Sequence, residues 1–88
     1  MTLPAAELDR VVGRYELAPN VEIAIARRGD GLTAQLTGQP AFPIFAEAPL
    51  RFFWKVVNAQ IEFTADANGM VTGGTFAQDG RQIPLKRL

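Results

Sequence analysis

Short runs of β-branched and aromatic residues, separated by turn residues, recur along most of the chain. From residue 13 onward eight such runs follow one another, at intervals of roughly eight to twelve residues, a spacing typical of all-β domains. Side chains alternate within them, as in the run 21–26, where Val21, Ile23 and Ile25 are interleaved with smaller or charged residues. Such alternation gives a strand one dry face and one wet face. The sequence therefore predicts a β protein with well-defined strand registers.

Turn residues set the limits of the eight predicted strands. Asp, Asn, Gly and Pro gather between the runs because they accept the backbone conformations of tight turns. Pro43 interrupts the fourth run, which therefore fits an edge or bulged strand better than the middle of a continuous sheet. The predicted strands span residues 13–17, 21–26, 32–37, 41–48, 51–57, 59–65, 70–77 and 82–88.

The segment that precedes the first strand predicts a short helix over residues 4–12. Leu8, Val11 and Val12 share one helical face there, and Gly13 follows the predicted end. The short connections between strands suit an up-and-down meander, and closing it into a barrel removes the edge strands that invite aggregation. With 88 residues the chain can build only one core. We expect a single domain over residues 1–88, a small eight-stranded up-and-down barrel with a short N-terminal helix.

The residue types that the chain lacks restrict its chemistry. It contains no Cys, no His and no Ser, so neither a Ser-His-Asp nor a Cys-His nucleophile can be assembled. A zinc ion would be without its commonest ligands. The nine basic residues are balanced by nine acidic ones, which leaves no excess positive charge to attract phosphates. We expect no enzymatic activity, no cofactor, no metal site and no nucleic-acid partner.

Three local features fit structural roles better than functional ones. Residues 66–69 look like a calcium loop only superficially, because the third oxygen ligand and the bidentate Glu are missing, and we predict a turn. The basic doublets 27–28 and 86–87 have no stripe of exposed aromatic residues beside them and are predicted to be surface charges. The first 20 residues hold no apolar run long enough for a signal peptide or a membrane span. We expect a soluble chain, and the sequence does not predict its cellular compartment.

The order of the landmarks along the chain resembles a known family. These landmarks are Gly13 to Leu17, the turn at Asp30-Gly31, Gly38-Gln39-Pro40, Phe52-Phe53, Ile61 to Phe63, Asp66 to Gly69, and the closing Lys86-Arg87-Leu88. The succession resembles the small lipocalin-like domain found C-terminal to serine β-lactamase-like catalytic domains of the penicillin-binding-protein and esterase type. The resemblance implies an accessory barrel that packs on a catalytic domain, oligomerises or shapes access to the active site. It implies no chemistry of its own, since the catalytic Ser and Lys motifs belong to the preceding domain.

Aromatic residues carry the remaining functional signal. Core packing explains most of them, because an eight-stranded barrel is just wide enough for side chains to fill it. Phe52, Phe53 and Trp54 are consecutive, however, so a regular strand turns at least one of them outward. An outward aromatic side chain near Phe45 would form an apolar patch of the kind that marks a partner surface. The candidate interaction surface comprises Phe45, Phe52, Phe53 and Trp54, and the sequence leaves open which of the consecutive aromatics faces outward.

Two functions remain open at this stage. The first is a non-catalytic accessory or interaction module that mediates docking or oligomerisation, with a serine β-lactamase-like hydrolase domain or a second copy of the chain as its partner. The alternative is a carrier or sensor that holds a small apolar ligand inside the barrel, although this many aromatic residues leave little room for one. Quenching of Trp54 fluorescence by an apolar probe would favour the carrier.

Overall fold

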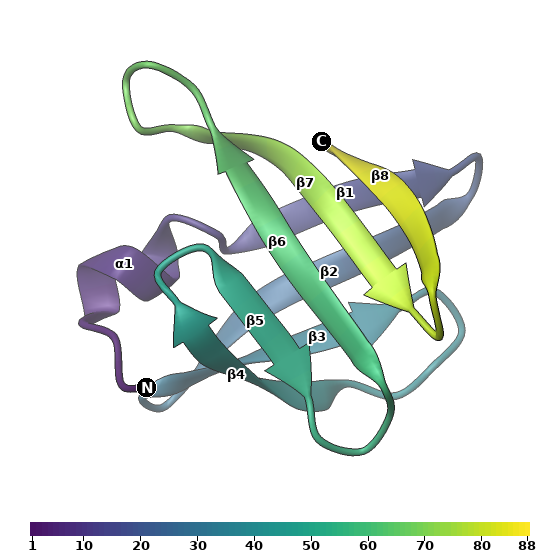
Figure 1. The fold of residues 1–88 in the computed structure, drawn as a ribbon, viewed down its shortest axis with the longest axis horizontal. Helices are drawn as coiled ribbons and strands as arrows, with labels where there is room; N and C mark the ends of the chain where they lie inside the picture. Colours follow the sequence, from purple (N-terminus) through teal and green to yellow (C-terminus); the bar gives the residue numbers. More distant parts are fainter.

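A single antiparallel sheet closes on itself to form the body of the molecule (Figure 1). The computed structural model describes all residues 1–88. Its elements are α1 (Ala5–Asp9), β1 (Gly13–Ala18), β2 (Val21–Arg28), β3 (Gly31–Leu36), β4 (Phe42–Ala48), β5 (Arg51–Trp54), β6 (Ala59–Ala65), β7 (Val71–Gln78) and β8 (Arg81–Arg87). The strands follow one another around the barrel in chain order, and β8 pairs back onto β1. The predicted all-β barrel with a short N-terminal helix is confirmed.

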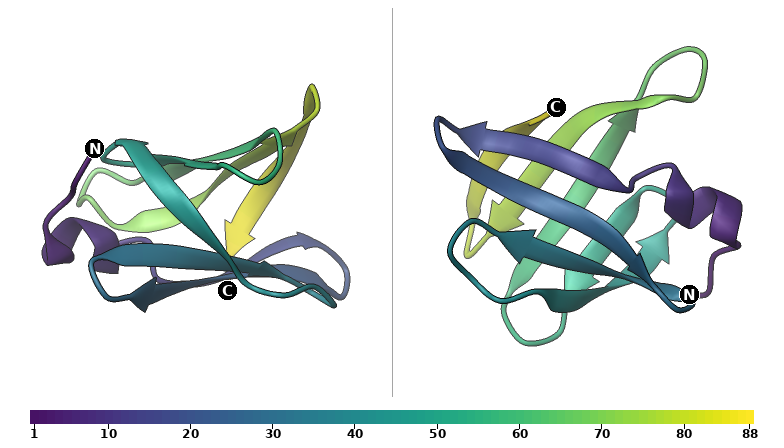
Figure 2. Two further views of the ribbon diagram at one scale, coloured as in Figure 1. Left: turned by 90° about the horizontal axis from the view of Figure 1, so that it is seen from below. Right: turned by 180° about the vertical axis from the view of Figure 1, so that it is seen from behind.

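The barrel is flattened rather than round. Its principal extents are 30 × 29 × 22 Å. Seen from below in Figure 2, β1 to β3 form one layer and β5 to β7 lie above them, with α1 beyond one end of both layers. Side chains from opposite walls meet inside the barrel, as do Tyr15 on β1 and Phe63 on β6, whose ring centroids are 5.2 Å apart.

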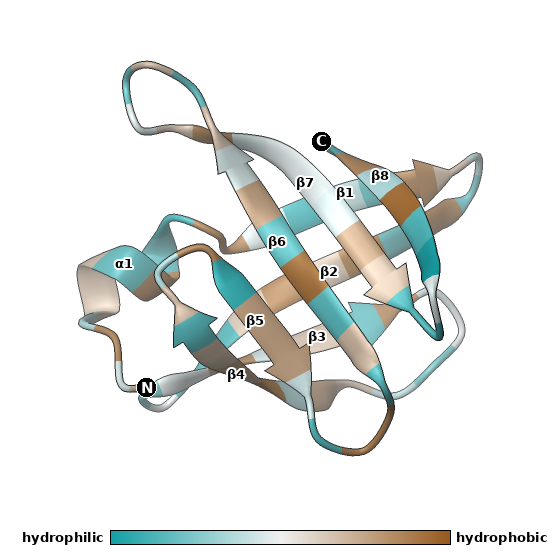
Figure 3. Ribbon diagram, in the orientation of Figure 1, coloured by the Kyte–Doolittle hydropathy of each residue, from teal (hydrophilic) through white to brown (hydrophobic).

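Alternation along the strands builds the core. In β6, Ala59, Ile61 and Phe63 are buried and the residues between them are exposed, and Figure 3 shows the resulting bands of hydropathy. Across the barrel 17 buried apolar and aromatic side chains form one cluster. Each large side chain buried in this way stabilises the fold by roughly 1.5 to 3 kcal/mol. The wet and dry faces predicted for residues 59–65 are confirmed.

The end of β5 differs from the sequence prediction. The strand ends at Trp54 instead of continuing to residue 57, and Phe53 opposite Gln60 is its last pair with β6. Residues 55–58 make the connection, where the Ala59 N–H donates to the Val57 carbonyl at 3.0 Å. Val56 and Val57 favour strands by type, yet they are 60% and 45% exposed because this connection leaves the sheet.

The fourth strand is not an edge strand, so that alternative is wrong, but the predicted bulged character is borne out by a register shift three residues after Pro43. In the closed barrel every strand has two neighbours, and Pro43 lies opposite Thr33 in the ladder between β3 and β4. The irregularity of β4 lies between Ala46 and Ala48, against β5. The β3–β4 ladder contains only three residue pairs, so the missing proline N–H interrupts little pairing.

The helix α1 covers one end of the barrel. It ends at Asp9, before the predicted residue 12, but Leu8 and the following Val11 are both buried in the core. An ion pair of 3.0 Å between Arg27 on β2 and Asp9 also joins α1 to the wall. The chain forms no helix with the length and apolar character needed to cross a membrane. The two ends of the barrel are therefore different, because one is covered by α1 and the other is bordered only by strand connections (Figure 1).

Candidate functional site

The four aromatic residues of the candidate surface divide between the two faces of the barrel wall. Phe52 is 1% exposed and Trp54 is 6% exposed, and both point into the core. Phe45 and Phe53 are half-buried on the outer face. Pairing explains the division, because Phe52 lies opposite the buried Ile61, which turns its neighbours on β5 the other way. Phe52 and Trp54 therefore do not belong to the outer surface.

Phe45 and Phe53 form an aromatic pair on the outer wall. They lie opposite each other in the ladder between β4 and β5, with ring centroids 5.9 Å apart. The ammonium nitrogen of Lys55 sits 4.0 Å from the centroid of the Phe45 ring, a cation–π distance. We call Phe45, Phe53 and Lys55 the aromatic surface. It combines apolar area with one positive charge.

Charged side chains border the aromatic surface on one side. Arg51 lies between two carboxylates, 3.4 Å from Glu47 and 3.7 Å from Glu62. These three side chains are solvent-accessible, so their ion pairs add little to the stability of the fold. A polar rim around an apolar centre is the usual anatomy of a protein interface.

The N-terminal segment borders the aromatic surface on another side. The amino group of Met1 donates to the Ala46 carbonyl at 3.2 Å. A groove of about 420 Å³ lies here, lined by residues 1–3 together with Phe45, Phe53 and Lys55. The chain terminus therefore lies beside the aromatic surface.

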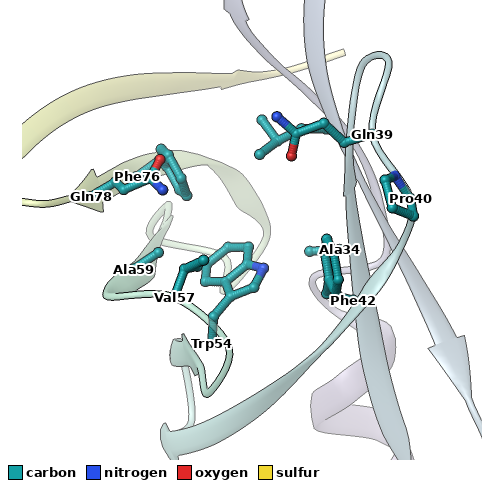
Figure 4. A pocket seen from close by; sticks show the side chains of 10 residues that line it. Ala34, Gln39, Pro40, Phe42, Trp54, Val57, Ala59, Phe76 and Gln78 are labelled. Carbon is teal, nitrogen blue, oxygen red and sulfur yellow. The ribbon is translucent and has the colours of Figure 1, made fainter.

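The end of the barrel away from α1 holds a second site, which we call the mouth pocket. Its volume is about 80 Å³, and Figure 4 shows its side chains. The Trp54 and Phe76 rings meet there edge to face, with centroids 5.4 Å apart. Seven of its ten lining residues are hydrophobic, and the full set is Ala34, Leu36, Gln39, Pro40, Phe42, Trp54, Val57, Ala59, Phe76 and Gln78.

Arg87 joins β8 to the segment that follows α1. Its guanidinium donates to the carbonyls of Arg10 (3.1 Å), Val12 (2.6 Å) and Val71 (2.9 Å). The prediction that this arginine is a surface charge is wrong, because a carbonyl-lined site at the covered end of the barrel binds its donors. Arg87 is thus a structural residue.

Tyr15 packs beside Arg87 at the same end of the barrel. Its hydroxyl donates to the Val11 carbonyl at 2.8 Å, which satisfies a polar group in the core. Burial raises the pKa of the Tyr15 phenol above its ordinary value, and the Arg87 charge opposes that rise. The neutral phenol is the form that the fold favours.

The predicted turn at residues 66–69 is confirmed. The Asp66 carboxylate accepts the main-chain N–H groups of Asn68 (2.9 Å) and Met70 (3.0 Å). This is the local bonding by which Asp stabilises a turn. Elsewhere, too, no group of three or more acidic, His or Cys side chains comes close enough to hold a metal ion.

A family model shows which protein family the chain belongs to. The model described as "Domain of unknown function (DUF3471)" matches residues 1–87. The chain belongs to the DUF3471 family. No curated protein matches it. Because the family description assigns no activity, the function of this DUF3471 domain has to be argued from its own surfaces.

Sequence reasoning missed two features of this DUF3471 domain. The mouth pocket brings together Trp54 and Phe76, which are far apart in the chain and meet only through the pairing of β5, β6 and β7. The role of Arg87 depends on the closure of β8 onto β1. No local sequence pattern predicts either feature. The predicted topology gives one indirect signal, because closing eight strands into a barrel places residue 87 close to the residues that follow the helix.

Proposed function

We propose that this DUF3471 domain is a non-catalytic accessory module that docks onto a serine β-lactamase-like hydrolase domain through the aromatic surface. The observation that carries the proposal is the outward-facing pair of Phe45 and Phe53 with Lys55 over one ring. Aromatic side chains dominate the binding energy of many interfaces because they bury a large area at little entropic cost. The rim formed by Arg51 and its two carboxylates supports orientation of a partner.

The position of the amino terminus supports a partner on this side of the barrel. Met1 to Leu3 run along the groove that Phe45 and Phe53 line. A domain joined ahead of Met1 would therefore emerge next to the aromatic surface and could cover it without a long linker. Such short tethering raises the effective concentration of the partner and strengthens even a small contact.

The residue content supports an accessory role rather than an independent activity. Nucleophilic catalysis uses Ser or Cys activated by a base in most hydrolases, and the chain has no Ser, Cys or His. In the proposal the hydrolase domain supplies all of the chemistry, and the barrel supplies a rigid surface that positions the partner. We expect the isolated barrel to show no hydrolysis of its own.

Isothermal titration calorimetry tests the proposal. The purified chain is titrated into a serine β-lactamase-like hydrolase domain that has been separated from its own C-terminal barrel of the DUF3471 type. We expect saturable binding that Phe53→Gln weakens by at least about tenfold, equivalent to about 1.4 kcal/mol. The matched control is Val21→Gln, which replaces a 38% exposed apolar side chain on β2 and should leave the affinity unchanged.

The possible results test both the choice of partner and the choice of surface. Absence of binding by the unmodified chain, or equal loss with both variants, would overturn the proposed docking. Sedimentation velocity on the chain alone adds a further check. A dimer that Phe53→Gln dissociates would replace the hydrolase partner with a second copy of the chain.

A further inference from the structure

The mouth pocket combines aromatic walls with polar side chains, which core packing alone does not require. Its walls are Phe42, Trp54 and Phe76 with small apolar residues, and the amides of Gln39 and Gln78 also line it. None of its lining residues is charged. The pocket is lined in part by members of the buried cluster, and it lies at the end of the barrel that α1 leaves uncovered.

Trp54 brings a polar group into this pocket that has no protein partner. The side chain is 94% buried, at 6% exposure, yet its indole N–H makes no hydrogen bond within the chain. No fully buried polar side-chain atom of the protein lacks a partner, so the indole nitrogen of Trp54 keeps some accessibility. Figure 4 shows the indole nitrogen turned toward the side where Ala34 and Phe42 lie. A donor held in an apolar wall is a specific recognition element.

We propose that the mouth pocket binds a small uncharged molecule that combines an apolar body with one hydrogen-bond acceptor, and that Trp54 donates its indole N–H to that acceptor. The aromatic walls bind the apolar body. A ketone, ester or amide carbonyl matches the donor that Trp54 supplies. A carboxylate does not, because burying an ion beside uncharged residues costs far more free energy than one hydrogen bond returns.

The volume of the pocket limits the size of the molecule. At about 80 Å³ it is far below the pockets of about 300 Å³ or more that hold drug-sized ligands. A dry engineered cavity of about 150 Å³ is known to hold benzene. The mouth pocket therefore suits a molecule smaller than a six-membered ring, such as a short-chain ketone, and not a lipid-sized cargo.

This inference is independent of the proposed docking. The mouth pocket shares no lining residue with the groove beside the aromatic surface, and the two lie at different ends of the barrel. If the hydrolase domain does not bind, the proposal of a ligand site is unaffected. If the pocket does not bind a ligand, the proposal of a docking surface is unaffected.

Nuclear magnetic resonance titration of the whole chain tests the inference. Trp54 is the single tryptophan, so the protein gives one indole N–H resonance. Butanone is the probe, and we expect a saturable shift of that resonance. Butyrate carries the same number of carbons but a charge, and 2-methyl-1-butene has a CH₂ in place of the carbonyl oxygen. We expect both to bind at least about tenfold more weakly, the factor that one hydrogen bond supplies.

Two variants show where butanone binds. Ala34→Leu fills the pocket and should abolish the shift, whereas Ala26→Leu adds the same side chain to an exposed position on β2 and should not. In Trp54→Phe the main-chain amides of Phe76 and Gln78 report binding, and the preference for butanone over 2-methyl-1-butene should disappear. If Ala34→Leu does not fold, Trp54→Phe still decides the question. No saturation, equal binding of all three probes, or an unchanged preference in Trp54→Phe would overturn the inference.

Discussion

Arg87 lies over the ring of Tyr15, with its guanidinium carbon 5.6 Å from the ring centroid, and both side chains bind the main chain just after α1. Tyr15 donates to the Val11 carbonyl and Arg87 to the next carbonyl, that of Val12. The first and last strands of the barrel thus hold the same short segment. Closure of the sheet and attachment of the helix therefore depend on the same contacts, because β1 and β8 pair next to the segment that joins α1 to the barrel.

Removing the Arg87 guanidinium should destabilise the whole barrel. Arg87→Met keeps most of the apolar stem but loses three hydrogen bonds to carbonyls, and we expect a loss of about 2 to 4 kcal/mol in the free energy of unfolding. Arg87→Lys should recover little of it, since one ammonium cannot match the planar fork. Urea denaturation gives the values. The control Arg81→Met, at an exposed position, should change the free energy by less than about 0.5 kcal/mol, and an Arg87→Met variant as stable as this control would contradict the assigned role.

The Tyr15 phenol should make the fold sensitive to alkaline pH. Burial raises its pKa in the folded state above the value of 10.0, so the folded state holds the proton more tightly than the unfolded state. This contribution to stability is complete below pH 10 and is lost as the pH rises through the folded-state pKa. Tyr15→Phe lacks it and also loses the bond to Val11, which costs about 0.5 to 1.5 kcal/mol at neutral pH. Urea midpoints at rising pH should show the gap between the two proteins narrowing above pH 10, and a constant gap would refute the prediction.

The sequence predicts the fold well because the strands are local units. Residues 59–65 alternate cleanly, and Asp66 and Gly69 mark the next turn, so strand existence and order need no knowledge of distant contacts. The end of β5 is less predictable. Val56 and Val57 have strand-forming side chains, and only the position of β6 shows that they lie in a connection. Local propensity gives way there to tertiary pairing.

The candidate site is less predictable than the fold because it depends on register. Three consecutive aromatics must alternate, but whether Phe53 or its two neighbours face outward is decided by the pairing of Phe52 with Ile61. The same dependence hides the mouth pocket, where Trp54 meets Phe76 across β6. The sequence alone limits the candidate surface to a group of aromatic residues. The pairing of β5 with β6 then determines which of them face outward.

Inward and outward aromatics on β5 should differ sharply in their effect on stability. Phe52 fills the core, so Phe52→Ala should lower the free energy of unfolding by about 3 to 5 kcal/mol through lost burial and a residual cavity. Phe53→Ala removes a half-buried ring from the outer wall and should cost less than about 1.5 kcal/mol. Chemical denaturation of both variants measures the contrast. Equal losses would mean that Phe53 is as much a core residue as Phe52.

The glycine pair at the centre of β7 should be the least tolerant point of the barrel. A Cβ on Gly73 would collide with the Leu85 carbonyl oxygen on β8, and one on Gly74 would collide with the Glu62 carbonyl oxygen on β6. Neither obstacle is a flexible side chain, so Gly73→Ala forces β7 away from its partner and opens the ladder. We expect a loss of more than about 4 kcal/mol, the range of exceptional single substitutions, and little folded protein. Gly31→Ala, where the nearest atom is 3.9 Å away, is the matched control and should stay folded. The dispersion of amide resonances distinguishes the two, and a well-folded Gly73→Ala protein would show that β7 can move outward without loss of closure.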